Sequence, residues 1–140
     1  MMLALLPFVA TSGHAAGDEP RSERALRLSL QTDRAVYRTG QAVRFQLTLS
    51  NDSTKAIPLR CNDAQRFDLL VQDTSGKSVW RWSEDQMFAQ MQSEETIQPG
   101  KSLVYTAVFT GTLSPAEYRA SGVILCLEPP VSAHAAFTVH

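Results

Sequence analysis

The two cysteines and three histidines of this chain are the residues with the most direct catalytic chemistry. A thiolate nucleophile needs a histidine beside it as a base, and the histidines stand at positions 14, 134 and 140. Only His134 falls inside the body of the domain, so neither a Cys–His site nor a metal site is expected. In an oxidising compartment Cys61 and Cys126 would form a disulfide, which leaves no thiolate. The alternative is two separate buried thiols.

Two pairs of adjacent carboxylates, Glu84-Asp85 and Glu94-Glu95, are the other candidates for catalysis. Neighbouring residues of a strand point to opposite faces, whereas glycoside hydrolysis needs two convergent carboxyl groups. We therefore interpret both pairs as solvated loop charges. The chain also has no glycine-rich phosphate loop and no calcium-binding spacing. We expect no catalytic residues, no metal and no cofactor, and hence no enzyme.

Aromatic and methionine side chains suggest a binding surface instead. Trp80 and Trp82 are two positions apart, so in a strand they share one face and could stack on a sugar or a peptide; the alternative is core packing. Met87, Phe88 and Met91 form an apolar cluster in a polar segment, and flexible methionines suit an adaptable contact surface. The alternative there is a plug that closes one end of the core. The candidate partner contacts are Trp80, Trp82, Ser83, Met87, Phe88 and Met91.

The elements that must position these residues are strands. With 140 residues the chain is long enough for one domain, and apolar and polar residues alternate with period two along much of it. The clearest case is Val43 to Ser50, and glycines such as Gly76 and Gly100 mark turns. Strands are predicted at residues 26–31, 43–50, 57–60, 67–72, 78–82, 103–109, 118–127 and 133–139. This pattern predicts an all-β fold, an immunoglobulin-like antiparallel β-sandwich of seven to eight strands over residues 25–140.

One segment departs from the strand pattern. In Ser83 to Gln92, Ser83 and Gln86 have the spacing of a capping box, which indicates a short helix. The alternative is an irregular loop whose Phe88 fills one end of the sandwich. Further along, Tyr118 begins a strand and matches the tyrosine corner of immunoglobulin-like sandwiches, in which the hydroxyl bonds an upstream backbone group.

The N-terminus has the features of an export signal. Residues 1–16 contain no charged side chain, and an apolar stretch is followed by small residues, as in a secretory signal peptide, although the usual basic residue is missing. A retained lipid-embedded segment and an ordinary disordered terminus are the alternatives. Ten apolar residues are too few for a stable membrane span. We expect a signal at 1–16, a flexible lead-in at 17–24, and a secreted, periplasmic or cell-envelope protein. A net charge of −1 with no basic run argues against nucleic acid as a partner.

The middle of the chain resembles the intracellular proteinase inhibitor family (the BsuPI domain). The resemblance lies in an aromatic-Asp strand, a Gly-Lys turn, a Trp-Ser pair, and a following Phe and Gln: Phe67-Asp68, Gly76-Lys77, Trp82-Ser83, Phe88 and Gln90. It implies a β-sandwich and inhibition of a serine protease. The expected export, the cysteine pair and the strand after Pro129-Pro130 depart from the family pattern. We expect structural roles for Phe67, Asp68, Gly76, Gly100 and Tyr118.

The function expected from the sequence is protein binding through loops at one end of the sandwich. The family resemblance makes the partner a serine protease, blocked sterically by a rigid loop, with the Trp82 to Gln92 segment as the first choice for the contact. The alternatives are a non-inhibitory cell-envelope module for assembly or adhesion, and a carbohydrate-binding module that uses Trp80 and Trp82.

Overall fold

The computed structural model describes residues 25–127 and 129–140, so the expected signal at 1–16 and lead-in at 17–24 lie outside the described part. No helix in these residues has the length and apolar character needed to cross a membrane. The elements, in chain order, are β1 (Leu26–Thr32), β2 (Val36–Tyr37), β3 (Val43–Asn51), β4 (Ile57–Cys61), β5 (Phe67–Asp73), β6 (Ser78–Arg81), the 3₁₀ helix η3 (Trp82–Asp85), β7 (Ser93–Ile97), β8 (Ser102–Phe109), β9 (Ala116–Ile124) and β10 (Val131–Val139).

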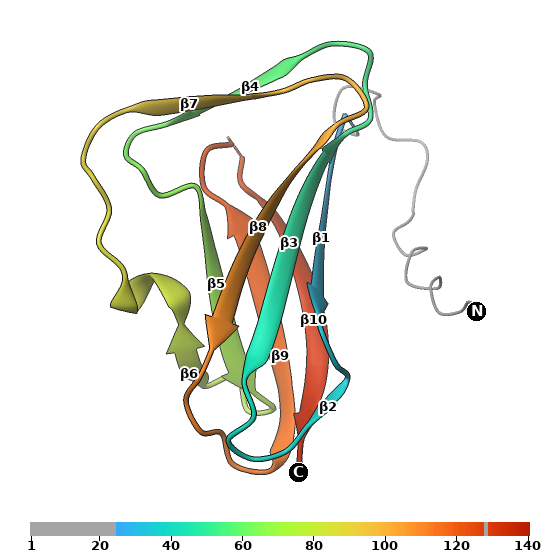
Figure 1. The fold of residues 1–140 in the computed structure, drawn as a ribbon, viewed down its shortest axis with the longest axis vertical. Helices are drawn as coiled ribbons and strands as arrows, with labels where there is room; N and C mark the ends of the chain where they lie inside the picture. The colour runs from blue at the N-terminus through green and yellow to red at the C-terminus, as the bar shows by residue number, and fades with distance from the viewer. Residues whose placement is uncertain (1–24, 128) are drawn as a thin grey trace.

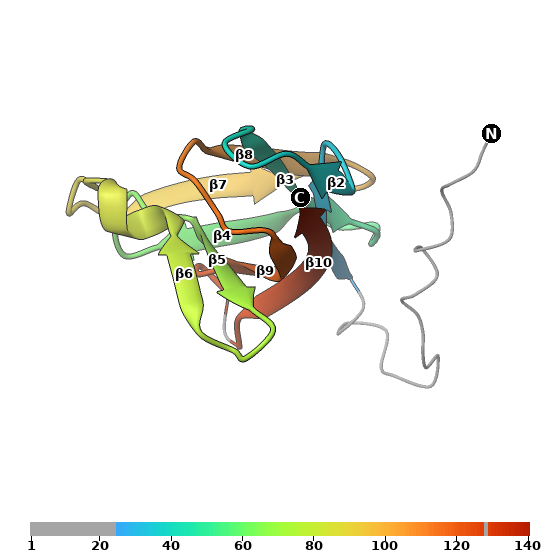
Figure 2. The ribbon, with the colours of Figure 1, turned by 90° about the horizontal axis from the view of Figure 1, so that it is seen from below.

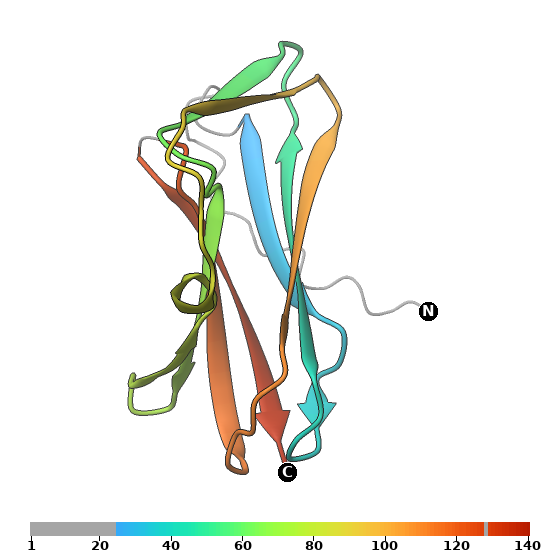
Figure 3. The same cartoon turned by 60° about the vertical axis from the view of Figure 1, so that its left-hand side comes forward.

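Two sheets face each other, which confirms the all-β sandwich. One sheet has the strand order β1-β3-β8 and the other β2-β10-β9-β5-β6, and Figure 3 shows them as two layers. Every pair in them is antiparallel except β2 with β10. Figure 2 shows β6 and β2 on opposite sides of the molecule, as the strand order requires. The sequence did not predict β2 or β7, so the described residues hold ten strands where seven to eight were expected.

A separate ribbon closes one end of the sandwich. β4 and β7 pair with each other alone and cross the top of the molecule (Figure 1). Leu59 and Ile97, one from each strand, are fully buried, so the ribbon seals the space between the two layers. A disulfide joins Cys61, at the end of β4, to Cys126 in the β9–β10 connection. The ribbon is thereby tied covalently to the larger sheet.

The core follows from the alternation in the strands. In β3 every second residue is buried, with polar side chains between. The largest fully buried side chains are Tyr37, Phe45, Leu47, Leu49, Leu59, Leu69, Ile97, Ile124, Val43, Val71 and Asn51. Asn51 is the polar member. It lies where β3 ends, and its amide nitrogen donates to the backbone carbonyls of Lys55 and Ile97 at 2.7 and 2.9 Å.

Two connections have the local geometry that their residues favour. The Tyr118 hydroxyl donates to the Ser114 carbonyl at 2.6 Å, which is the hydrogen bond of a tyrosine corner. In the β5–β6 turn, Gly76 has a φ of 88°, a left-handed conformation that glycine adopts without steric cost. The Asp73 carboxylate accepts from Ser75 and Lys77 backbone nitrogens across this turn, which fixes the hairpin before β6.

Candidate functional site

The two tryptophans lie against different parts of the core. Trp80, in β6, is stacked on Phe45 with ring centroids 5.8 Å apart and tilted against Phe109 at 5.1 Å. Trp82 lies beyond the end of β6 as the first residue of η3, and it stacks on Phe67 at 4.3 Å. Both side chains are partly buried against the core. Both tryptophans pack on core rings, as in the core-packing alternative, and Trp82 lies one residue beyond the end of β6 at Arg81.

A buried carboxylate lies beside the end of β6. Asp68 is 8% exposed and accepts hydrogen bonds from the Ser83 backbone nitrogen at 3.1 Å and from the Ser83 hydroxyl at 2.7 Å. The Arg81 guanidinium lies 3.6 Å from the same carboxylate. Since the Ser83 side chain is bound to Asp68, it does not cap a helix, and η3 has no side-chain cap. The expected capping box is therefore not formed, and Ser83 has a structural role.

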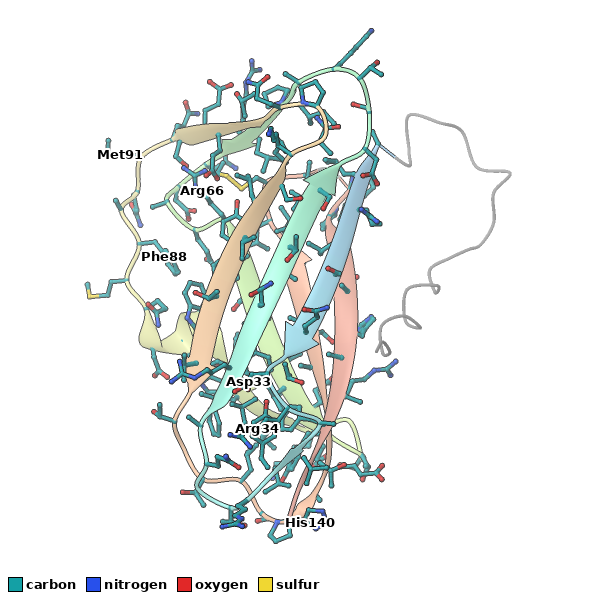
Figure 4. All side chains as sticks on the ribbon, turned by 45° about the vertical axis from the view of Figure 1, so that its right-hand side comes forward. Asp33, Arg34, Arg66, Phe88, Met91 and His140 are labelled. Atoms are coloured by element: carbon teal, nitrogen blue, oxygen red, sulfur yellow. A yellow bond between two sulfur atoms is a disulfide. The ribbon has the colours of Figure 1, made fainter. Side chains whose placement is uncertain are left out.

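The Ser83–Gln92 segment combines the two alternatives that the sequence left open: its first three residues belong to the short helix η3, and residues 86–92 form an irregular loop. We call residues Gln86–Gln92 the side loop, because they run along the side of the sandwich between η3 and β7 (Figure 1). Met87 is 98% exposed and Met91 is 66% exposed, so neither methionine plugs the core. Figure 4 shows Phe88 directed back towards the sandwich and Met91 directed away from it.

Phe88 is the outer ring of an aromatic row that leads into the core. Its ring centroid lies 5.7 Å from that of Trp82, Trp82 lies 4.3 Å from Phe67, and Phe67 lies 5.0 Å from Tyr105. Each contact of this kind contributes about 0.5–1.5 kcal/mol beyond the area it buries. The row connects the side loop through β5 to β8, and it holds the base of the loop against the sandwich.

The inner end of the row is polar. The Tyr105 hydroxyl donates to the Glu95 carboxylate at 3.0 Å, and Arg66 forms an ion pair with the same carboxylate. Burial and the charge of Glu95 raise the pKa of Tyr105 to about 12. Glu94, on the other face of β7, pairs with Arg60. The two carboxylates point to opposite faces, as expected, and Glu94 is exposed to solvent. The interpretation of the pair as loop charges is wrong because both lie in β7, and Glu95 is half-buried against Arg66 and Tyr105.

A second tyrosine–carboxylate pair lies near the far end of the sandwich, where Figure 4 labels Asp33 and Arg34. The Tyr37 hydroxyl donates to Asp33 at 2.5 Å, and the Arg44 backbone nitrogen donates to the same oxygen at 3.2 Å. Burial, then the hydrogen bond to Asp33, raises the pKa of Tyr37 to about 12. Burial acts to raise the pKa of Asp33 too, but its hydrogen bonds outweigh burial and hold that pKa below its usual value. The pair fixes the β1–β2 turn.

Residues that could support catalysis are engaged elsewhere. Cys61 and Cys126 are bonded to each other, and His134 lies on the outer face of β10 with its Nδ1 3.0 Å from the Ser121 hydroxyl. Among residues 25–127 and 129–140, no three histidine, cysteine or acidic side chains gather as a metal site would need.

The comparisons with known proteins agree with this geometry. The model of the family described as intracellular proteinase inhibitor, BsuPI, matches residues 30–128. The chain belongs to the BsuPI family. Four of its motif residues build the base of the side loop, since Phe67 stacks on Trp82 and Asp68 binds Ser83. Gly76, also in the motif, lies in the β5–β6 turn. These residues of the family signature therefore join β5 to η3 in this BsuPI domain. Among curated proteins, none matches the chain.

Solved structures share the fold of this BsuPI domain at low identity. The C-terminal domain of wzt matches with a TM-score of 0.54 and 11% identity, over 83% of this chain and 74% of that one. Spo0M, a sporulation control protein of Bacillus subtilis, matches with a TM-score of 0.52 and 15% identity, over 83% of this chain and 49% of that one. The alkylpurine DNA glycosylase AlkC of Pseudomonas fluorescens gives 0.51 and 11%, over 83% and 30%.

Sequence reasoning found part of this site. It singled out Trp82, Phe88, Met87 and Met91, missed Arg66 and Tyr105, and interpreted Glu95 as a solvated loop charge. Tyr105 carried a usable signal, because it alternates with the polar or exposed positions of β8 and so points inward. Arg66 and Glu95 carried none, since their partners come from distant segments.

Proposed function

We propose that this chain is a proteinase inhibitor that acts outside the cytoplasm and blocks the cleft of a serine protease sterically. The observation that carries the proposal is the side loop, an exposed segment whose base is built from the residues of the proteinase inhibitor family motif. The disulfide supports an oxidising compartment, in agreement with the signal predicted at residues 1–16. Its partner would then be a secreted, periplasmic or surface protease.

The mechanism needs no reacting group in the inhibitor. Phe88 packs on Trp82, and the Ala89 carbonyl accepts a hydrogen bond from the Ala64 backbone nitrogen at 3.0 Å. A loop held in this way loses little conformational entropy when it enters a protease cleft. The favourable contacts are then not offset by the cost of ordering the loop. Protein binding through the side loop, with no chemical step, accounts for inhibition.

The test is a titration of a subtilisin-type serine protease with the purified mature chain. We expect the proteolytic rate to fall in proportion to added inhibitor and to reach its minimum near one equivalent. The chain should stay intact by mass during the incubation. Digestion of the chain with no slowing of the protease would refute inhibition.

A second candidate function, assembly in the cell envelope, is favoured by one edge of the larger sheet. β2 pairs only with Thr138 and Val139, so Val131 to Phe137 of β10 form no ladder on that edge among the described residues, where β1 of the other sheet packs near β10 without pairing. An unpaired edge without charged side chains can accept an added strand from another protein. Co-purification with an envelope protein, lost on His134→Pro substitution at this edge, would support assembly, and a monomer in every pull-down would contradict it.

A further inference from the structure

Met87 is the most exposed large apolar side chain in the described part of the protein. At 98% exposure it has almost no contact with the rest of the molecule, although Phe88 beside it is partly buried. A single exposed apolar residue is common on protein surfaces. What distinguishes Met87 is that the backbone on both sides of it is held in place.

On the N-terminal side, Met87 follows a turn that the core anchors. Ser83 is bound to the buried Asp68 carboxylate, and the Gln86 backbone nitrogen donates to the Ser83 carbonyl at 3.1 Å. Gln86 then has φ −117° and ψ 156°, which is extended backbone. The chain therefore leaves η3 in an extended conformation immediately before Met87.

On the C-terminal side, two contacts hold the next two residues. The Phe88 ring packs against Trp82 with centroids 5.7 Å apart, and the Ala89 carbonyl accepts from the Ala64 nitrogen at 3.0 Å. Ala64 follows Cys61, which is fixed by the disulfide to Cys126. Met91 differs, because no backbone hydrogen bond of the loop is found at residues 90–92.

We infer that Met87 is the specificity residue of the inhibitor and enters the apolar primary specificity pocket of a serine protease. The inference rests on the proposed inhibition. A protease binds its target as an extended segment with one side chain in that pocket, and the backbone here is extended before Met87, with the side chain projecting. The methionine side chain is long, unbranched and uncharged, so it suits an apolar pocket and not one with a buried acid, which selects arginine or lysine.

The experiment uses the full mature chain and three substitutions: Met87→Ala, Met87→Arg and Met91→Ala. Inhibition constants are measured against a subtilisin-type or chymotrypsin-type protease with an apolar pocket and against trypsin. Because Met87 lies in solvent, its variants should unfold at the same temperature as the parent chain. That measurement separates a loss of contact from a loss of fold.

Met87→Ala removes the side chain that the protease pocket would bury in the complex, so it should weaken inhibition of the apolar-pocket protease by about 10- to 150-fold. Met87→Arg should weaken it further and gain inhibition of trypsin. Met91→Ala, the matched control on the same loop, should change it by no more than about 2-fold. If the parent chain inhibits and both Met87 variants inhibit equally well, the specificity assignment is wrong while inhibition stands. If the parent chain inhibits neither protease, both proposals fail.

Discussion

The hydrogen bonds between Asp68 and Ser83 should couple the two residues energetically. The Ser83 hydroxyl lies 2.7 Å from one carboxylate oxygen and the Ser83 nitrogen 3.1 Å from the other. Asp68 is 8% exposed, so water replaces these bonds poorly. A hydrogen bond to a charged group contributes about 1.5–3 kcal/mol. Ser83→Ala should therefore lower the free energy of unfolding by about 2 kcal/mol.

Asp68→Ala should cost more, about 3 kcal/mol or above, because it also leaves the Ser83 donors without an acceptor. If the interaction is direct, the double variant should be less destabilised than the sum of the single variants, by about 1–2 kcal/mol. The assay is equilibrium urea unfolding of the oxidised chain. A loss of about 2 kcal/mol, as expected for Ser83→Ala, lowers the urea midpoint by about 1 M. The matched control is Asp73 with Ser75, an aspartate–serine bond of 2.6 Å in the exposed β5–β6 turn, for which no measurable coupling is expected.

A coupling energy below about 0.3 kcal/mol would refute the reasoning, since that is the additivity expected of residues that do not interact. The variants also report on the side loop. If the Asp68–Ser83 hydrogen bonds hold the side loop in place, Ser83→Ala should increase amide hydrogen exchange at Gln86 and Phe88. Unchanged exchange there would mean that other contacts hold the loop.

Two further predictions concern the covalent link and alkaline pH. Replacing both Cys61 and Cys126 by alanine removes a cross-link that closes 65 residues, and on the chain-entropy model the free energy of unfolding should fall by about 4 kcal/mol; an unchanged urea midpoint would contradict this. The pKa values of Tyr37 and Tyr105 are raised to about 12 in the folded protein, above the ordinary value near 10, so stability should be fully present below pH 10 and fall as pH rises towards 12. Urea midpoints measured from pH 8 to 12 test this, and Tyr105→Phe should make the decline shallower.

Most strands could be predicted because their alternation reports directly on burial. In β3 the pattern runs through nine residues without a break, and a strand with one buried face must show it. β7 could not be predicted in this way. Its sequence is mostly polar, so no apolar alternation marks it. The inward carboxylate of Glu95 is stabilised by Arg66, which immediately precedes β5, and by Tyr105 in β8. β2 was missed because two residues give no periodicity, and its parallel pairing with β10 joins opposite ends of the chain.

The segment from β6 to the side loop shows where local sequence patterns mislead. Ser83 and Gln86 have capping-box spacing, but the Asp68 carboxylate, fifteen residues earlier in the chain, binds the Ser83 hydroxyl instead. Trp80 and Trp82 have strand spacing, but β6 ends at Arg81, between them. The residue types were therefore informative, but the direction of the Ser83 side chain is set by Asp68, a partner that sequence periodicity does not reveal.

The strand pairing has a consequence for a protein that meets proteases. A cut in the side loop would divide the chain into a piece carrying β1 to η3 and a piece carrying β7 to β10. The ladders β3–β8, β5–β9 and β4–β7 each have one strand in either piece, and so does the Cys61–Cys126 bond. The two pieces would remain associated through these ladders and the disulfide, and their separation on a denaturing gel would require a reductant.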